Sequence, residues 1–426
     1  MVLQTLRRQP FVLDYAIRME QTFFESGQKG FTGHRHVELE RDSRSSRMVG
    51  GETEDLSHGE NLAMLPPAVR SLLRRTPTVA PIPHRSLIAV TGSQASQFLN
   101  GIVSCPVSGP PNRHHFTAFL HAQGRVIYDI FLHAYTTEAG RPGYLIEYDS
   151  RPSQETPLLP LLKRYILRAK VRVADVSDQY DVWASWGSEK ELHWETERQW
   201  SGAPSGVFET VWDPAGEWPW GHEPGVIRDR RAVGLGHRLL VRKGDIPSQT
   251  STHDMGTPED YLIHRILHGV PEGSIDIPST LAFPMDSNLD IMGGLDFRKG
   301  CYVGQELTVR TYHKGVIRKR IFPVALSSST ENAIPPLEAG QDIKVVLSER
   351  GQGDAPRPRP RGTGKLLSSV KGVGLALLRL EHVNMVLKGS ATFQLDVSSG
   401  SEQHQANVLP WIPSWWPISF EETDSG

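Results

Sequence analysis

The sequence predicts an α+β fold that ends in a small β-barrel-like domain. Helix-start signals, such as the N-cap residue, proline and two acids of Thr257-Pro258-Glu259-Asp260, alternate with the short apolar runs typical of strands. In the C-terminal part, strand-like segments at 343–347 and 374–380 flank a Pro/Gly-rich loop at 350–362. The length of 426 residues leaves room for two or three modules with a substantial core.

The apolar spacing also predicts the order of the elements. From Ser86 onward we expect a strand at 87–90, a helix capped by Ser93 and ended by Gly101, a hairpin of 116–120 and 126–132 around a turn at 122–124, a helix at 158–166, a strand at 169–176 and a helix that ends at Gly269. In the hairpin, Asp129 shares a face with Ile127 and Phe131, which are unusual neighbours for a carboxylate. Residues 186–226 are rich in Trp, Glu and Pro and predict a loop-heavy insert.

Residues 1–84 are predicted to be a disordered leader. Residues 26–60 are polar and charged with few spaced apolar residues, which is typical of disorder. From Met64 the chain is rich in Arg and free of acids, the composition of an organelle-targeting presequence. We therefore place an import signal around 64–80, with 1–63 as extra leader or the result of a misplaced start. A plain disordered arm is the alternative.

Composition excludes several function classes. A formal charge of −2 and a pI near 6.8 argue against an electrostatic nucleic-acid or anionic-membrane binder. No apolar run is long enough to span a membrane. Two cysteines cannot form a disulfide framework or a zinc or iron–sulfur site made by this protein alone. These features predict a soluble protein of a reducing compartment.

Cys301 is the strongest candidate for a reactive or metal-binding side chain. It follows Arg298 and Lys299 and lies between Gly300 and Gly304, so a sharp turn, nearby cations and a helix starting near Gly304 would favour the thiolate. The alternative is a small buried hydrophobe between two turn glycines. An iron–sulfur cluster needs about four ligands, so one thiolate can serve only a cluster shared with another protein.

Other candidate residues are weaker. Cys105 has no comparable setting and is expected to be structural. His264 and His268, four residues apart on one helix, could bind a metal but lack a third ligand, so a packed or surface pair is favoured. The glycines of 234–236 lack the third glycine of a dinucleotide loop, and the basic stretch 314–320 is expected to be a solvated strand or turn.

The segment Lys299-Gly300-Cys301-Tyr302-Val303-Gly304-Gln305-Glu306 resembles the signature of the YgfZ-type family. This family comprises iron–sulfur cluster assembly factors related to the aminomethyltransferase of the glycine cleavage system (the T-protein), and its eukaryotic members are mitochondrial matrix proteins. Further segments resemble the family: 164–165, 168–171, 229–231, 234–236, 269–273, 284–289, 310–311, 315–320 and 374–379. The resemblance covers about 86–325 and 362–415.

The resemblance implies a ring of subdomains around a central channel. It places an aminomethyltransferase-like region at 85–325, the barrel-like domain at 326–418 and a tail at 419–426. It also implies an assembly factor, not an enzyme with independent turnover, that acts with A-type iron–sulfur carrier proteins in maturing [4Fe–4S] clients such as aconitase and lipoate synthase. Cys301 would give one ligand to a shared [2Fe–2S] cluster, or would protect and reduce a cluster intermediate.

The same resemblance assigns roles around Cys301. Lys299 and Arg298 would keep the thiolate charged, and Gly300 and Gly304 would let a partner approach closely. The side chains of Gln305 and Glu306 would brace the loop by hydrogen bonds; Tyr302 completes the motif.

A tetrahydrofolate-dependent aminomethyltransferase is the alternative function. The T-protein binds folate in its channel and uses an acidic pair on the hairpin strand. Here that strand carries Arg125, Tyr128 and Asp129, so only one acid of the pair is present. The segment 233–238 lacks the pterin-binding glutamate, a loss of about 1.5–3 kcal/mol. Aminomethyl transfer is therefore not expected, while tetrahydrofolate binding stays open. In a third alternative the protein is a scaffold and Cys301 only packs.

Overall fold

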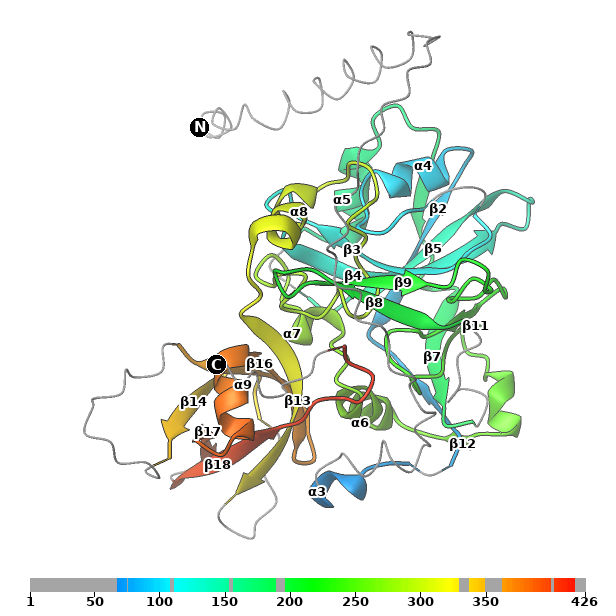
Figure 1. Ribbon diagram of the computed structural model, residues 1–426. Helices are drawn as coiled ribbons and strands as arrows, with labels where there is room; N and C mark the ends of the chain where they lie inside the picture. Colours follow the sequence, from blue (N-terminus) through cyan, green and yellow to red (C-terminus); the bar gives the residue numbers. More distant parts are fainter. Residues whose placement is uncertain are drawn as a thin grey trace, which may run out of the picture. The chain divides into compact units, whose positions relative to one another are not determined.

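The computed structural model describes residues 67–417, apart from short gaps at 75, 108–110, 153–155, 189–195, 329–336, 349–361 and 400–401. Most of the predicted leader, the Pro/Gly-rich loop and the tail lie outside these residues. The described part contains two five-stranded sheets, a hairpin and a closed barrel (Figure 1). None of its helices is long and apolar enough to cross a lipid bilayer.

The first sheet has the order β3-β4-β5-β2-β6. Its strands are β2 (Arg85–Thr91), β3 (His115–Leu120), β4 (Val126–Thr136), β5 (Pro142–Asp149) and β6 (Arg172–Asp175). Helices α4 (Ala95–Asn100) and α5 (Leu158–Tyr165) lie next to this sheet (Figure 1). They pack on one of its faces in an apolar cluster that includes Ile88, Phe98, Leu132 and Leu162.

The second sheet has the order β10-β11-β7-β1-β12. Its strands are β1 (Thr78–Pro81), β7 (Tyr180–Trp186), β10 (Val226–Arg228), β11 (His237–Arg242) and β12 (Asp254–Met255). A separate hairpin, β8 (Arg198–Gly202) and β9 (Phe208–Trp212), lies within the segment predicted to be a loop-heavy insert. The remaining short elements are α3 (Pro67–Arg70), α6 (Pro258–Leu267), α7 (Gly273–Asp276), α8 (Gln305–Lys314) and a 3-10 turn η2 (Ser248–Ser251).

The C-terminal part forms a closed six-stranded barrel in the order β13-β16-β15-β14-β17-β18. Its elements are β13 (Lys319–Ser328), β14 (Asp342–Leu347), β15 (Gly364–Val370), β16 (Val373–Arg379), α9 (Leu380–Leu387), β17 (Ala391–Ser399) and β18 (Glu402–Pro410). The barrel is as expected, but it begins at Lys319, before the boundary placed at 326. Arg320, expected in a solvated stretch, is fully buried and pairs with Asp290 at 2.8 Å.

The folded region begins earlier than the sequence predicted. Strand β1 (Thr78–Pro81) pairs with β7, and Val69 is buried against the barrel side of α6. Two arginines of the acid-free stretch form structural ion pairs: Arg74 contacts Asp260 at 2.6 Å, and Arg85 is buried. Residues 67–84 therefore belong to the fold, so the import signal predicted around 64–80 overlaps folded residues, and it stays a prediction.

Local details correct two further expectations. The N-cap of α4 is Gln94 instead of Ser93, with no side-chain cap. A bulge between Phe119 and Leu120 changes the register of β3 against β4, so Ile127 joins the apolar cluster on the face opposite Asp129. Phe131 does share the Asp129 face. The helix start at Thr257 is as predicted, and the structure adds a capping box with Asp260.

Candidate functional site

Cys301 lies at the exposed tip of the loop that leads into α8. Asp296 Oδ1 begins the loop by accepting hydrogen bonds from the amides of Arg298 and Lys299, at 2.8 and 2.7 Å. Cys301 is exposed, and a Cβ built on Gly300 would meet no described atom within 4 Å. The thiol and its preceding glycine therefore form an open surface that another molecule can reach.

Lys299 anchors this loop from inside. Its Nζ donates hydrogen bonds to the carbonyl oxygens of Asn100, Val103 and Cys105, at 2.8, 2.7 and 3.0 Å. The ammonium also lies 4.9 Å from the centroid of the Tyr302 ring. Burial lowers the pKa of Lys299 to about 8. Three carbonyls and an aromatic ring thus bind the Lys299 ammonium inside the protein. The sequence had predicted that this ammonium keeps the Cys301 thiolate charged.

Arg298 likewise makes its contact away from Cys301. The guanidinium Nε lies 2.7 Å from Glu209 Oε1, and the Arg298 side chain remains largely exposed. The expected roles of Arg298 and Lys299 in keeping Cys301 ionised gain no support from these contacts.

Two glycines from separate segments fix where the loop lies. Gly304, the N-cap of α8, has φ +83°, and a Cβ there would lie 2.4 Å from the His121 carbonyl oxygen. Gly124, in the turn between β3 and β4, has φ +78°, and a Cβ there would lie 2.5 Å from Leu307 Cβ. Both positions need glycine for backbone conformation and for space. The hairpin turn therefore packs directly on the start of α8.

The rest of the motif braces the loop to different degrees. Tyr302 is buried, and its hydroxyl lies 3.1 Å from Thr308 Oγ1. Gln305 Nε2 donates a hydrogen bond to the Lys299 carbonyl at 3.4 Å, as expected. Glu306 is exposed in the first turn of α8 and makes no hydrogen bond with the described residues. Its carboxylate therefore faces solvent. The sequence had predicted that it braces the loop by a hydrogen bond.

The three possible folate-channel residues do not converge. Asp129 is buried, where its carboxylate accepts hydrogen bonds from Arg85 Nη1 at 3.2 Å and the Gly273 amide at 2.9 Å. Tyr128 points to the other face of β4, into the apolar cluster that also includes Val303. Arg125 lies over the Phe283 ring at 4.0 Å. One acid, one tyrosine and one arginine thus occupy three different surroundings.

Sequence reasoning missed a buried ionic network beside Asp129. Glu147 accepts hydrogen bonds from Arg85 Nε at 2.9 Å and from Arg238 Nε at 3.0 Å, and Glu272 accepts one from Arg238 Nη1 at 3.0 Å. Burial alone would raise the pKa of Glu147, but the attraction of Arg238 and Arg85 outweighs it and lowers the pKa overall. Burial does raise the pKa of Asp129, despite Arg85. The sequence does contain a signal of this network, because Glu147 is an acid within the apolar run 144–148.

Arg238 lies in the segment where the T-protein resemblance places a pterin-binding acid. The segment 233–238 carries no acid, and its arginine is fully buried against two carboxylates of the protein itself. Its charge is therefore already neutralised within the fold.

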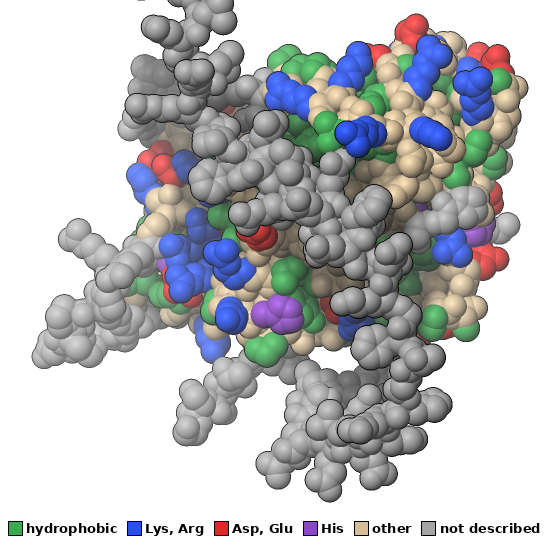
Figure 2. Space-filling model, turned by 90° about the horizontal axis from the view of Figure 1, so that it is seen from above, with side chains coloured by type: hydrophobic (Ala, Val, Ile, Leu, Met, Phe, Trp, Pro, Cys, Tyr) green, Lys and Arg blue, Asp and Glu red, His purple; other side chains and the backbone are tan. Residues whose placement is uncertain are grey.

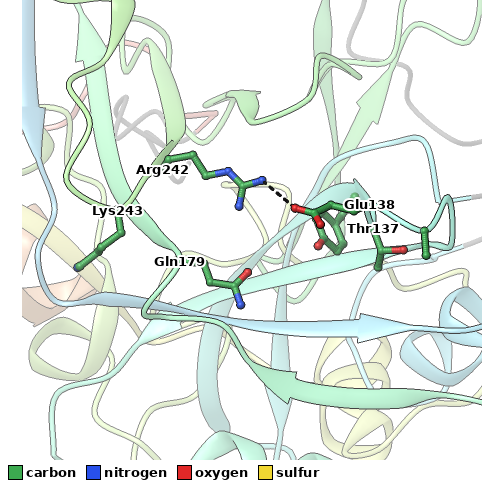
Figure 3. Close-up of a pocket in the computed structure, with 7 residues that line it drawn as sticks. Thr137, Glu138, Gln179, Arg242 and Lys243 are labelled. Atoms are coloured by element: carbon green, nitrogen blue, oxygen red, sulfur yellow. Dashed lines mark ion pairs between the residues drawn. The ribbon is translucent and has the colours of Figure 1, made fainter.

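Two surface depressions lie away from the motif. One, of about 650 Å³, is lined by residues that include Glu138, Gln179, Arg242 and Lys243, with Arg242 reaching toward Glu138 at 3.9 Å (Figure 3). Another, of about 530 Å³, lies between α6 and β15. None of the predicted site residues lines either depression.

A metal site made by the described residues alone is absent: they contain no group of three or more His, Cys, Asp or Glu side chains able to hold an ion. His264 is a packed residue, as favoured from the sequence, and stacks on Trp186 at 4.6 Å between ring centroids. Cys105 is buried, and burial raises the pKa of its thiol to about 12. Cys301 therefore stands without co-ligands in the described part of the chain.

Comparison with solved structures and a family model supports the expected fold. The aminomethyltransferase T of the glycine cleavage system from Bartonella henselae has a TM-score of 0.50 at 14% identity, covering 80% of this chain and 86% of that one. This likeness concerns the fold alone. Residues 318–418 match the family model described as CAF17, C-terminal beta-barrel domain. The T-protein-like α+β fold with a C-terminal barrel is thereby confirmed.

Curated relatives are similar over most of the chain. The protein named iron-sulfur cluster assembly factor IBA57 homolog, mitochondrial, from Cryptococcus neoformans var. neoformans serotype D is 36% identical and covers 79% of this chain and 94% of its own length. Proteins of the same name from Mycosarcoma maydis and Pyricularia oryzae are 31% and 37% identical, covering 80% and 78% of this chain and 85% and 82% of theirs. This chain therefore belongs to the family of IBA57-type mitochondrial iron–sulfur cluster assembly factors.

Proposed function

We propose that this chain is a mitochondrial matrix iron–sulfur cluster assembly factor and that Cys301 gives one thiolate ligand to a cluster held jointly with a partner. The observation that carries the proposal is the exposed Cys301 on a loop anchored from behind by Lys299, with no co-ligand among the described residues. A [2Fe–2S] cluster takes about four protein ligands, so the others come from a second protein.

The partner we propose is an A-type carrier protein loaded with a [2Fe–2S] cluster, and the products are [4Fe–4S] clients of the aconitase and lipoate synthase type. In such a complex Cys301 completes the ligand set. The open space around Gly300 lets the partner backbone approach, and the Lys299 anchor keeps the thiol from withdrawing.

The transferase alternative is weaker on the geometry. Asp129 is engaged by Arg85 and by the Gly273 amide, and Tyr128 lies on the opposite face of β4. A folate ring would need free donors and acceptors at one place. The buried Arg238, bonded to Glu147 and Glu272, supplies neither.

The experiment mixes the full chain with a [2Fe–2S]-loaded A-type carrier and follows visible absorbance, circular dichroism and size-exclusion elution. We expect a cluster-containing heterocomplex that Cys301→Ser abolishes. The matched control is Cys105→Ala, because this second cysteine is buried away from solvent. A heterocomplex indifferent to Cys301→Ser would overturn the shared-ligand role. Without any complex, saturable tetrahydrofolate binding with aminomethyl turnover would support the transferase instead.

A further inference from the structure

A strongly basic surface lies beside the Cys301 loop. Residues 163–172, from the end of α5 to the first residue of β6, carry five exposed cations and no acid: Lys163, Arg164, Arg168, Lys170 and Arg172. We call these five residues the basic surface. Lys163, Arg164, Lys170 and Arg172 have no ion-pair partner in the described part of the chain. Their charge stands out because the whole chain is nearly neutral, at −2.

Apolar side chains are exposed within the same segment. Leu167 is 77% exposed and Tyr165 is 37% exposed. A tight turn, in which the Leu167 amide donates to the Tyr165 carbonyl at 3.0 Å, directs Leu167 outward. Ile166 and Ala169 on either side pack into the apolar cluster beneath, so the turn is held by the core. Leu167 therefore offers an apolar contact within a charged face.

Helix α4 connects the basic surface with the Cys301 loop. At its start, Gln94 Oε1 accepts a hydrogen bond from the Lys170 amide. At its end, the Asn100 carbonyl accepts from Lys299 Nζ at 2.8 Å, and the Gly101 carbonyl accepts from the Val303 amide at 3.3 Å. Six helical residues span about 9 Å. The two surfaces are therefore close enough to belong to one interface.

The ribbon and space-filling views agree with this placement. In Figure 1, α4, α5 and α8 lie at the same end of the molecule. Figure 2, which views that end, shows Lys and Arg side chains spaced among hydrophobic ones across part of the face.

We propose that the basic surface docks an acidic patch on the protein that presents the cluster to Cys301, with Leu167 inserting into a shallow apolar depression of that partner. This inference rests on the proposed function. The chemistry is complementary because a thiolate-ligated [2Fe–2S] cluster carries net negative charge, which exposed cations attract. Exposed cations raise the rate at which such a partner arrives and orient it before Cys301 binds.

A folded protein fits this surface better than a lipid bilayer does. The exposed apolar side chains are one leucine and one partly covered tyrosine, whereas a helix that lies in a bilayer presents a continuous apolar face. The apolar face of α5 is already used, since Leu158 and Leu162 are fully buried in the core.

The test measures binding of the [2Fe–2S]-loaded A-type carrier to the full chain at several ionic strengths. We expect Lys163→Glu with Lys170→Glu to raise the dissociation constant about tenfold at low salt, with the difference shrinking at high salt because screening removes it. Each reversal is also made singly, and the matched control for each single reversal is Lys388→Glu, the same charge change on an exposed residue of the barrel domain. Leu167→Ser should weaken binding severalfold without a salt dependence.

The outcomes separate this inference from the function on which it rests. Cys301→Ser should abolish cluster retention but leave a salt-dependent encounter with the carrier, whereas the charge reversal should leave the cluster bound at high protein concentration. Equal affinities for the single charge reversals and their control would overturn the docking surface while leaving the Cys301 role intact. Unchanged carrier binding, combined with a reversal-sensitive binding to vesicles of phosphatidylcholine and cardiolipin, would assign the surface to a membrane and overturn the proposal.

Discussion

Gly124 and Gly304 lie against each other although 180 residues of sequence separate them: a Cβ on Gly304 would lie 3.4 Å from Gly124 Cα, and a Cβ on Gly124 would lie 3.1 Å from the Gly304 carbonyl oxygen. This contact joins the hairpin turn of the first sheet to the start of α8. The position of Cys301 relative to the sheet therefore depends on two residues that carry no side chain.

Gly304→Ala should destabilise the protein and displace the Cys301 loop. The residue has φ +83°, and its new Cβ would lie 2.4 Å from the His121 carbonyl oxygen, so the backbone must shift. We expect a loss of about 1–3 kcal/mol in the free energy of unfolding, measured with urea. Gly300→Ala is the matched control, because its Cβ meets open space and should change stability by less than about 0.5 kcal/mol. Equal effects of the two substitutions would contradict this account.

Lys299→Met should loosen the Cys301 loop while leaving most of the fold intact. The substitution keeps the apolar stem but leaves the carbonyls of Asn100, Val103 and Cys105 without their shared donor, at a cost of about 1–3 kcal/mol. Hydrogen exchange should speed up at the amides around 299–303. Arg298→Gln, at a largely exposed side chain, provides the comparison. Unaltered exchange in the lysine variant would show that the anchor is dispensable.

Removing one arginine from the buried ionic network should destabilise the fold more than removing that arginine together with one of its carboxylate partners. Arg238→Met leaves Glu147 and Glu272 with fewer cations in a buried site, and we expect a loss of about 3–5 kcal/mol. Adding Glu147→Gln removes one of the two carboxylates that lose Arg238 and should recover part of this loss, as shown by a double-mutant cycle of urea unfolding. Additive effects would indicate that the two side chains do not act as a pair.

Asp286 should give a distinct pH dependence. Burial raises the pKa of its carboxyl to about 6 from 3.8, although Lys319 and Arg320 oppose the shift. The folded state therefore binds the proton more tightly than the unfolded state, so this group stabilises the fold below pH 4 and loses that contribution as the pH rises through 6. Asp286→Asn should accordingly be more stable than the wild type at pH 7, by about 1–2 kcal/mol, and the gap should narrow toward pH 4. A gap that widens on acidification would contradict the assigned shift.

The mature N-terminus should lie before Val69. Val69 is buried, and β1 (Thr78–Pro81) is an interior strand of the second sheet, so cleavage beyond Val69 would remove core residues. N-terminal sequencing of the protein purified from mitochondria gives the answer directly. A mature end within or after β1 would mean that the strand is not needed for the fold.

Local patterns predicted what local physics determines. The apolar run around Ile88, the turn at Gly124 and the helix start at Thr257 each depend on a few neighbouring residues, and the structure has all three. The barrel was predicted from the strand-like spacing of 343–347 and 374–380. The family came from a motif around Cys301, and the relatives confirm it.

The features that sequence reasoning missed depend on distant partners. The bulge that moves Ile127 to the other face of β4 arises where β3 and β4 fall out of register. The burial of Arg85 depends on Glu147, which lies 62 residues away. The inward direction of Lys299 depends on carbonyls almost 200 residues earlier in the chain. Composition placed Arg74 in a leader because its carboxylate partner, Asp260, lies 186 residues later and could not be seen from its neighbours.

The contrast between the two cysteines has a practical consequence. The chain has two thiols, and Cys105 is enclosed while Cys301 is open to solvent. A maleimide-linked fluorophore or nitroxide will therefore label native protein at one defined position without engineering. The probe would stand on the loop whose base is fixed by Gly124 and Gly304, so changes in its rotation would report what approaches that loop.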